Sequence, residues 1–387
     1  MKESPAFHRY LFWCLMAFAA TAVASIALQN FIWIAVAIFL FFQIKNHIKF
    51  YWPQGLFPIA TLLFLASYFA AALWGIDPAN SFQGVHKTLT FLLVFFVAAM
   101  PLVLEEIQQI LRTFIYGATF CAVCGIGKHY FLHQDRIDSF SGDKMVFGGL
   151  LMVSFIINAS FLKNRFQEII PWLTLGLIGI ALIFTQTRGA WVGCAVGFII
   201  LTWKQSRKAL VVGCLAALVS FFFLPQSLQE RIKSICDIHI TYNAQHQVVD
   251  ASQSRILIWA TGWGIIQDHP WGVGQGNVGK IYPQYDRTTL ASYERSEPHL
   301  HNNYLQILAQ NGWPGFIIYL FWIFSYYRSV FKFKAANPRA MELNWTLMAV
   351  FSATLVWGLT EYTFSHQFMN VQFFLLGLQA WLWKQKT

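Results

Sequence analysis

The side chains best suited to chemistry lie between residues 252 and 315 of this 387-residue chain. This stretch contains Arg255, Glu297, His299 and His301 in a protein of which only 11% is charged. Guanidinium groups bind anionic oxygens in a two-pronged way, and histidine can take up a proton near neutral pH. The stretch therefore predicts a site that holds an anionic group and moves a proton.

Two further arginines lie earlier in the chain, in short polar segments next to apolar runs. Arg188 stands in the sequence Thr-Gln-Thr-Arg-Gly-Ala, and Arg136 stands in Asp-Arg-Ile-Asp. An arginine beside apolar runs is costly to bury, so it is a functional candidate. The alternatives remain open at this point: Arg188 as an anchor for lipid head groups, Arg255 as a solvated helix charge, and His301 as a structural helix cap.

The elements that must position these residues are membrane-spanning helices. The composition is 57% hydrophobic, and continuous apolar runs of a length that can cross a bilayer recur along the chain. The runs lack the period-two alternation of an outer-membrane barrel. We predict an all-α polytopic membrane protein of about twelve spans, at 10–28, 30–44, 56–74, 88–104, 113–131, 146–162, 169–186, 190–204, 209–224, 312–327, 341–361 and 370–384.

The distribution of charge predicts the topology. If the chain crosses the membrane at each predicted span, most lysines and arginines of the connecting segments lie on the same side as the two termini. By the positive-inside rule, this side is the cytoplasm. The net charge of +10 then reflects membrane orientation and not a nucleic-acid partner. The apolar run near the N-terminus resembles a signal peptide, but a second run follows at once, and we interpret it as a retained span. The six cysteines predict no disulfide framework.

One large outward segment divides the chain into three predicted regions: a bundle of about nine helices at 1–224, a loop at 225–311, and a bundle of about three helices at 312–387. Within the loop, apolar residues at helical spacing follow Ser254, a possible N-cap, and place Trp259 and Trp263 on one stripe. Pro270 should end this helix. A second helix should begin near Pro298 and continue into the next span.

Three motif matches in the loop are rejected. Gly274 to Gly279 fits a dinucleotide-binding pattern but follows a predicted helix instead of a strand, and the overlapping Walker-type match has Ile281 where a hydroxyl should bind magnesium. His299, His301 and Glu297 could ligate a metal, but residues two apart do not face each other on a helix. We expect neither a metal nor a cofactor.

The sequence resembles the O-antigen ligase and polymerase superfamily. His301-Asn302, nine residues and then Gly312-x-x-Gly315 reproduce the signature H-N-x9-G-x-x-G, and the segments around Arg188 and Arg255 are similar to other landmarks of that family. The resemblance extends to the topology. It implies a membrane-embedded, GT-C-like glycosyltransferase in the bacterial inner membrane, with a periplasmic active site.

The resemblance also implies the reaction and its partners. Such enzymes transfer a glycan from undecaprenyl diphosphate to a sugar by a metal-independent, inverting mechanism; for a ligase the acceptor is the lipid A core. Arg188 and Arg255 would hold the diphosphate, and His301 would be the base, although His301 could instead bind phosphate. Residues expected to bind substrate with less support are Arg136, Asn302, Tyr304, Glu297 and Trp259.

Four functions were compared. An O-antigen ligase is the first, and a polymerase that uses a second lipid-linked glycan as acceptor is the next. A protein O-oligosaccharyltransferase would fit a longer chain better. A transporter of lipid-linked sugars should carry ionisable residues in the middle of several spans, whereas here the polar groups gather at one outward surface.

Overall fold

The structure is a computed structural model that describes residues 5–45, 53–138, 140, 142–162, 165, 167–205, 211, 222, 226–233, 251–286, 299–364 and 366–384. These residues form helices and connecting segments and contain no strand. The helices are α1 (Pro5–Thr21), α2 (Ile26–Lys45), α3 (Leu56–Trp74), α4 (Pro78–Val85), η1 (His86–Leu92), α5 (Leu93–Ala99), α6 (Leu104–Leu132), α7 (Lys144–Leu162), α8 (Ile169–Phe184), α9 (Arg188–Gln205), α11 (Gln226–Lys233), α12 (Ala251–Asp268), α13 (Val278–Tyr285), α14 (Asn303–Lys332), α15 (Pro338–Trp357) and α16 (His366–Lys384).

Several of these helices can cross a membrane. Among the described residues, five stretches are both long and apolar enough: Leu56–Trp74, Pro78–Ala99, Leu104–Leu132, Lys144–Leu162 and Asn303–Lys332. Shorter apolar helices occur at Ile26–Val36, Ile169–Phe184 and Arg188–Trp203. The described part of the chain is therefore all-helical, with several helices long and apolar enough to span a membrane, and the number twelve stays a prediction. The predicted span at 209–224 lies almost wholly outside the described residues.

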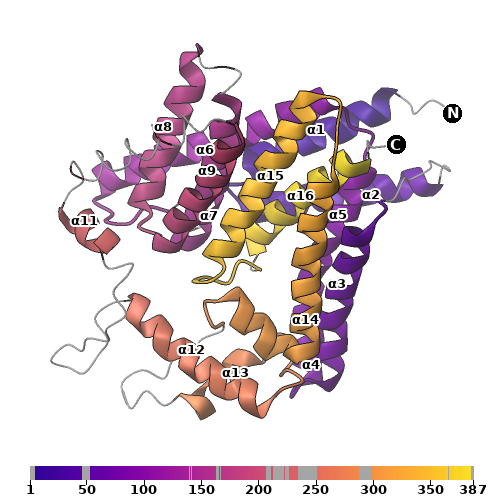
Figure 1. Cartoon of the computed structure of the whole chain (residues 1–387), viewed down its shortest axis with the longest axis vertical. Coiled ribbons are helices and arrows are strands. Elements are labelled where there is room, and N and C mark those ends of the chain that lie inside the picture. The colour runs from indigo at the N-terminus through magenta and orange to yellow at the C-terminus, as the bar shows by residue number, and fades with distance from the viewer. Residues whose placement is uncertain are drawn as a thin grey trace.

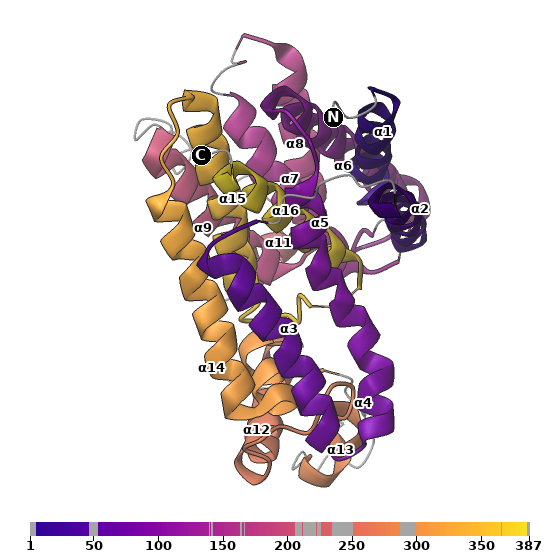
Figure 2. The same cartoon turned by 90° about the vertical axis from the view of Figure 1, so that its right-hand side faces the viewer.

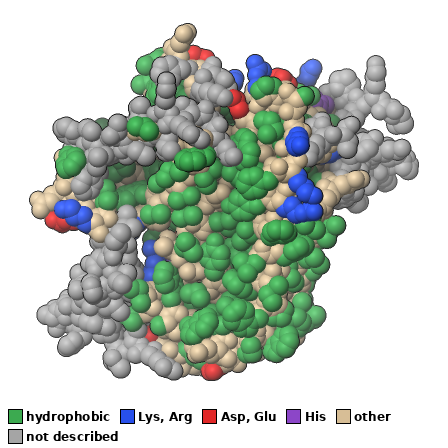
Figure 3. Space-filling model, in the orientation of Figure 1, with side chains coloured by type: hydrophobic (Ala, Val, Ile, Leu, Met, Phe, Trp, Pro, Cys, Tyr) green, Lys and Arg blue, Asp and Glu red, His purple; other side chains and the backbone are tan. Residues whose placement is uncertain are grey.

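The helices pack into an upper bundle and a smaller lower unit (Figures 1 and 2). In the bundle, α3 packs on α14, α9 on α15, α5 on α16 and α1 on α6. Helices α12 and α13 form the lower unit, and the long helix α14 connects the two. Figure 3 shows that hydrophobic side chains cover most of one face of the molecule, as expected for a surface in contact with lipid.

Aromatic side chains fill the contact between α3 and α14. The ring of Trp322 is fully buried and lies 6.0 Å from the ring of Phe57 and 5.4 Å from that of Phe64, between centroids. Its indole nitrogen donates to Oγ1 of Thr61 at 3.0 Å. A buried indole needs such a partner because no water reaches it. This contact fixes α14, which begins at the candidate site.

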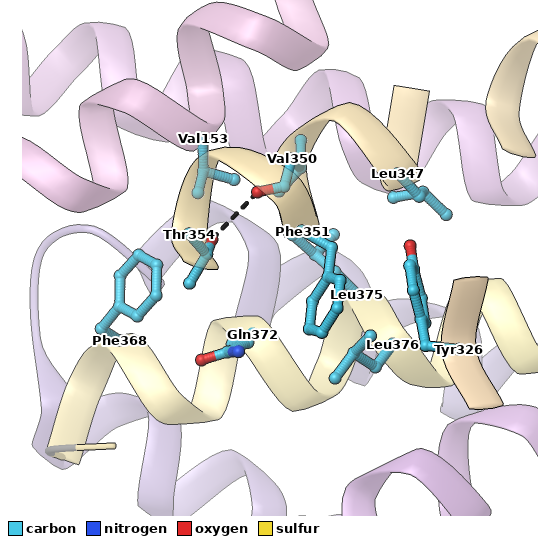
Figure 4. Close-up of a pocket in the computed structure, with 10 residues that line it drawn as sticks. All are labelled: Val153, Tyr326, Leu347, Val350, Phe351, Thr354, Phe368, Gln372, Leu375 and Leu376. Carbon is cyan, nitrogen blue, oxygen red and sulfur yellow. Dashed lines mark hydrogen bonds between the residues drawn. The ribbon is translucent and has the colours of Figure 1, made fainter. Parts of the chain in front are cut away.

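One cavity inside the bundle is too small to hold a substrate. Figure 4 shows a cavity between α15 and α16, in which Gln372 faces Thr354 and apolar side chains from α7 and α14. Its volume is about 10 Å³, which corresponds to one water-sized group. This cavity therefore holds no ligand larger than a water molecule.

The lower unit has its own apolar core. Ile258, Ile265 and Ile266 of α12 pack with Val273 and with Leu300. Helix α12 ends at Asp268, two residues before Pro270, so the predicted end of this helix is confirmed. The predicted cap is wrong, because α12 begins at Ala251 and Ser254 lies inside it. The second predicted helix exists as α14, but it begins at Asn303.

A break in α14 attaches the loop after α12 to the membrane bundle. Gly312 has φ 66°, outside the helical region, so the helix kinks there. The amide of Val273 donates to the carbonyl of Ala309, and the amide of Trp313 donates to the carbonyl of Pro270, both at 2.9 Å. A Cβ at position 312 would overlap the backbone of Trp271. This close approach explains why a glycine is required at position 312.

Candidate active site

The residue His301 lies at the point where the lower unit meets the bundle. It has φ 46°, an uncommon value for a residue other than glycine. The next residue, Asn302, is the N-cap of α14: its Oδ1 accepts from the amides of Tyr304 at 2.9 Å and Leu305 at 3.0 Å. Because Asn302 caps the first turn of α14, the preceding residue His301 and its imidazole lie outside the helix.

The start of α14 is bound to the segment between α15 and α16. Asn303 donates through its backbone amide to the carbonyl of Gly358 at 2.7 Å, and its side chain exchanges two hydrogen bonds with Thr363. The side chain of Asn302 donates to the carbonyl of Leu359 at 2.8 Å. These bonds hold His301 against residues 358–363.

A buried carboxylate in that segment joins two of the predicted site residues. Oε1 of Glu361 lies 2.9 Å from Nδ1 of His301, and Oε2 accepts from Nη2 of Arg255 at 3.1 Å. The side chain of Glu361 is 7% exposed, whereas those of Arg255 and His301 are 14% and 23% exposed. The structure thus brings Arg255 and His301 together through a residue that the sequence analysis did not single out.

The surroundings keep Glu361 ionised. Burial alone would raise its pKa, because an interior disfavours the charged form. The hydrogen bond to His301 and the electrostatic interactions with His301, Arg255 and His299 act in the opposite direction, and the pKa of Glu361 lies below its ordinary value. The carboxylate is therefore a permanent acceptor for His301 and Arg255 at neutral pH.

Two more arginines belong to the same region. Arg188 is the first residue of α9 and is buried. The neighbouring Gly189 packs so closely on Thr360 that a Cβ there would overlap the Thr360 hydroxyl. Because Thr360 directly precedes Glu361, this contact brings the start of α9 to the carboxylate. The turn that precedes Arg188 includes Gln186 with φ 53°.

Arg136 lies beside this turn. Its Nε donates to the carbonyl of Thr185 at 3.1 Å, and its buried Nη2 has no hydrogen-bond partner among the described residues. Burial lowers the pKa of Arg136, and the charges of Arg255 and Arg188 lower it further. Arg136 therefore interacts electrostatically with both of these arginines.

An open cleft adjoins Arg136. It is lined by Arg136, Gly142, Asp143, Lys144 and Met145 and has a volume of about 530 Å³. A volume of this size accommodates a small ligand, in contrast to the cavity in the bundle. The cleft, the three arginines and the His301–Glu361 pair define the candidate site, which can bind an anion and accept a proton beside it.

A metal ion is chemically conceivable at one corner of this site. His299, His301 and Glu361 each offer a ligand atom, and these atoms lie within 4.8 Å of one another. The two histidines precede α14 and their rings lie 4.3 Å apart, so the helical argument against their convergence was wrong. However, both oxygens of Glu361 already accept hydrogen bonds, and the nearby arginines repel a cation. The local charge favours an anion.

The remaining predicted residues have different positions. The side chain of Asn302 is engaged in the helix cap, and the hydroxyl of Tyr304 donates to the carbonyl of Leu355 at 3.2 Å, so both have structural contacts. Trp259 packs on the core of the lower unit and its buried Nε1 has no partner among the described residues. Glu297 lies outside the described residues. A role in substrate binding stays a prediction for each of them.

Sequence reasoning missed Glu361, although a signal was present. It is an acidic residue between two apolar runs, and such residues are functional candidates in membrane proteins. The sequence analysis included it as the last residue of a span at 341–361. In the structure α15 ends at Trp357, so Glu361 belongs to a polar turn.

Fold and site together define a helical membrane protein with an arginine-rich histidine–carboxylate site at one end of its bundle. Residues 173–320 match the family model described as O-Antigen ligase. A protein of Rickettsia felis with the provisional name polysaccharide ligase is 23% identical over 320 residues, which cover 78% of this chain and 76% of that relative. The resemblance to the O-antigen ligase family is thereby confirmed. The matched segment contains Arg188, Arg255 and His301 and ends before Glu361.

Proposed function

We propose that the protein is a membrane glycosyltransferase of the O-antigen ligase type. It transfers a glycan from undecaprenyl diphosphate to a sugar of the lipid A core at the periplasmic face of the bacterial inner membrane, with both termini in the cytoplasm. The observation that carries the proposal is the network in which Glu361 links His301 to Arg255 beside two more arginines.

The arginines suit the leaving group. Cleavage of the bond between the sugar and the diphosphate places negative charge on the phosphate oxygens, and guanidinium groups stabilise this charge with paired hydrogen bonds. Arg136 has a buried donor, Nη2, that can serve this purpose. Arg188 and Arg255 supply further positive charge, and Arg255 is fixed in place by Glu361.

The His301–Glu361 pair suits the activation of the acceptor. With Nδ1 donating to the Glu361 carboxylate, Nε2 is left with the lone pair that takes the proton of the attacking hydroxyl. The carboxylate holds the ring orientation and stabilises the imidazolium that forms, as an acid does in hydrolase triads. The hydroxyl oxygen then attacks the anomeric carbon, the bond to the diphosphate oxygen breaks, and that oxygen leaves as an anion.

The reaction is proposed to need no metal ion. In many phosphate-transfer sites a divalent cation neutralises the leaving group. Here arginines provide the positive charge, and two of the possible metal ligands, His301 and Glu361, are bound to each other, with Glu361 also bound to Arg255. A bound metal would compete with Arg255 for Glu361.

The decisive experiment compares strains with and without the gene. Lipopolysaccharide is separated on a gel, and the glycan still attached to the lipid carrier is measured in the same cells. A ligase predicts core without attached glycan together with long chains on the carrier. Core that bears one repeat unit would indicate a polymerase instead, and unchanged lipopolysaccharide would contradict both.

A further inference from the structure

A second cluster of arginines lies at the opposite end of helices α6, α7 and α8 from the candidate active site. Helix α7 begins at Lys144, in the cleft, and ends at Leu162. Its 19 residues span about 28 Å at the usual helical rise, which is close to the thickness of the hydrocarbon layer. The residues at its far end therefore lie near the other surface of the membrane.

At this far end, Arg112 of α6 and Arg165 line a recess between the three helices, together with Tyr116, Asn158, Phe161 and Ile170. The volume of the recess is about 10 Å³, enough for one oxygen-sized group. It can therefore hold one oxygen of a larger anion that lies at its opening.

The charge in this recess is incompletely balanced. Arg165 pairs with Glu168, its Nε donating to Oε1 at 2.6 Å. The guanidinium carbon of Arg112 lies 5.8 Å from the centre of the Phe161 ring, and its buried Nε has no hydrogen-bond partner among the described residues. A buried donor without an acceptor is destabilising, so an anion that supplies one would bind favourably.

Exposed apolar side chains border one side of the recess. Tyr116 is 47% exposed and Ile170 is 52% exposed, and both line the recess. Ile169 and Leu173, which lie on α8 together with Ile170, are also exposed. Exposed aliphatic side chains at this position contact acyl chains, so the anion that reaches the arginines most readily carries an acyl chain itself.

We propose that this recess binds the phosphodiester anion of a lipid head group, in the leaflet opposite the candidate active site. One phosphate oxygen accepts from Nε of Arg112, and Arg165 contributes donors that Glu168 does not use. The acyl chains lie along Ile170 and Tyr116. This lipid site is independent of the glycosyl transfer proposed above.

The test uses the full-length protein purified in detergent and native mass spectrometry with added phosphatidylglycerol or phosphatidylcholine of the same chain length. The wild type should retain phosphatidylglycerol about fivefold better, since a basic residue near a lipid surface contributes about 1 kcal/mol. Arg112→Gln should abolish the preference. Arg339→Gln, which removes an exposed arginine from the first turn of α15, should keep it.

The proposal would be overturned if the wild type retained both lipids equally, or if Arg112→Gln and Arg339→Gln lost the preference for phosphatidylglycerol equally. It would also be overturned if inorganic phosphate stabilised the protein as much as phosphatidylglycerol does. The last result would indicate a soluble anion. If Arg112→Gln does not fold, Arg165→Gln provides the same comparison at the edge of the recess. Arg255→Lys should keep the lipid preference even where glycosyl transfer is lost, which separates this site from the active site.

Discussion

Oε1 of Glu361 lies 2.9 Å from Nδ1 of His301, although the two residues are 60 positions apart and belong to different polar segments. The other oxygen of the same carboxylate binds Arg255. One buried acid therefore positions both the proposed base and one of the proposed diphosphate ligands.

Substitution of Glu361 should impair turnover more than donor binding. Glu361→Gln removes the charge that orients His301 and stabilises its protonated form, and we expect kcat to fall at least about tenfold. His301→Ala should cost more, and the double variant should be no worse than His301→Ala alone, because the two residues act as a unit. Steady-state assays with a lipid-linked donor measure these effects.

The control for this series is Glu105→Gln, which changes an exposed acid at the start of α6. It should leave kcat unchanged. Additive losses in the double variant would contradict a shared role of Glu361 and His301.

Replacement of the arginines by lysine should show whether paired hydrogen bonds matter. Arg188→Lys and Arg136→Lys keep the charge but lose the planar fork, and we expect kcat to fall on the order of 100-fold in each. The amount of protein in the membrane should stay normal. Arg339→Lys serves as the matched control on an exposed arginine. Activity above half of the wild-type value in either variant would remove that residue from the site.

The pH dependence of stability follows from the low pKa of Glu361. The unfolded carboxyl titrates near pH 4.5, and the folded one titrates at lower pH. The stabilising contribution is thus fully present above pH 4.5 and is lost as the pH falls through the folded pKa. Thermal unfolding of the wild type and of Glu361→Gln should differ at pH 7, and the part of this difference that comes from the carboxylate charge should be lost as the pH falls below 4.5. A difference that grows in acid would contradict this assignment.

Gly312→Ala should destabilise the attachment of the loop to α14. A side chain there would overlap Trp271 and would also occupy the left-handed region, at a cost of about 1–3 kcal/mol before the overlap is counted. The unfolding temperature in detergent should fall by several degrees. Gly176→Ala is the control, because a Cβ at position 176 meets no atom within 4 Å. Equal stability of the two variants would mean that the loop adapts.

Chelation should leave transfer unchanged. If the arginines alone stabilise the leaving group, activity after treatment with EDTA and dialysis should remain within about twofold of the untreated enzyme. Loss of activity that is restored by one divalent metal would instead indicate that His299, His301 and Glu361 bind it.

The sequence predicted the resemblance to a family better than the geometry of the candidate site. Local signals sufficed for the end of α12 at Asp268, because proline cannot continue a helix. The importance of Arg255 and His301 followed from charge in an apolar context and from the family signature. Glu361 could not be placed, because its distance from His301 depends on how α14, α15 and α16 pack. The same holds for His299, whose contact with His301 requires a non-helical backbone at position 301.

The break in α14 at Gly312 also has a mechanical meaning. Backbone hydrogen bonds join residues 270–274 to the turn at 309–313, and the same helix begins at the His301–Asn302 corner. The loop after α12 and the His301–Asn302 corner are thus both attached to α14, which continues into the bundle. We expect a tilt of α14 within the bilayer, as a change in membrane thickness would produce, to strain the hydrogen bonds that hold the loop and the His301–Asn302 corner in place. Catalysis by this protein should therefore respond to the physical state of the surrounding bilayer.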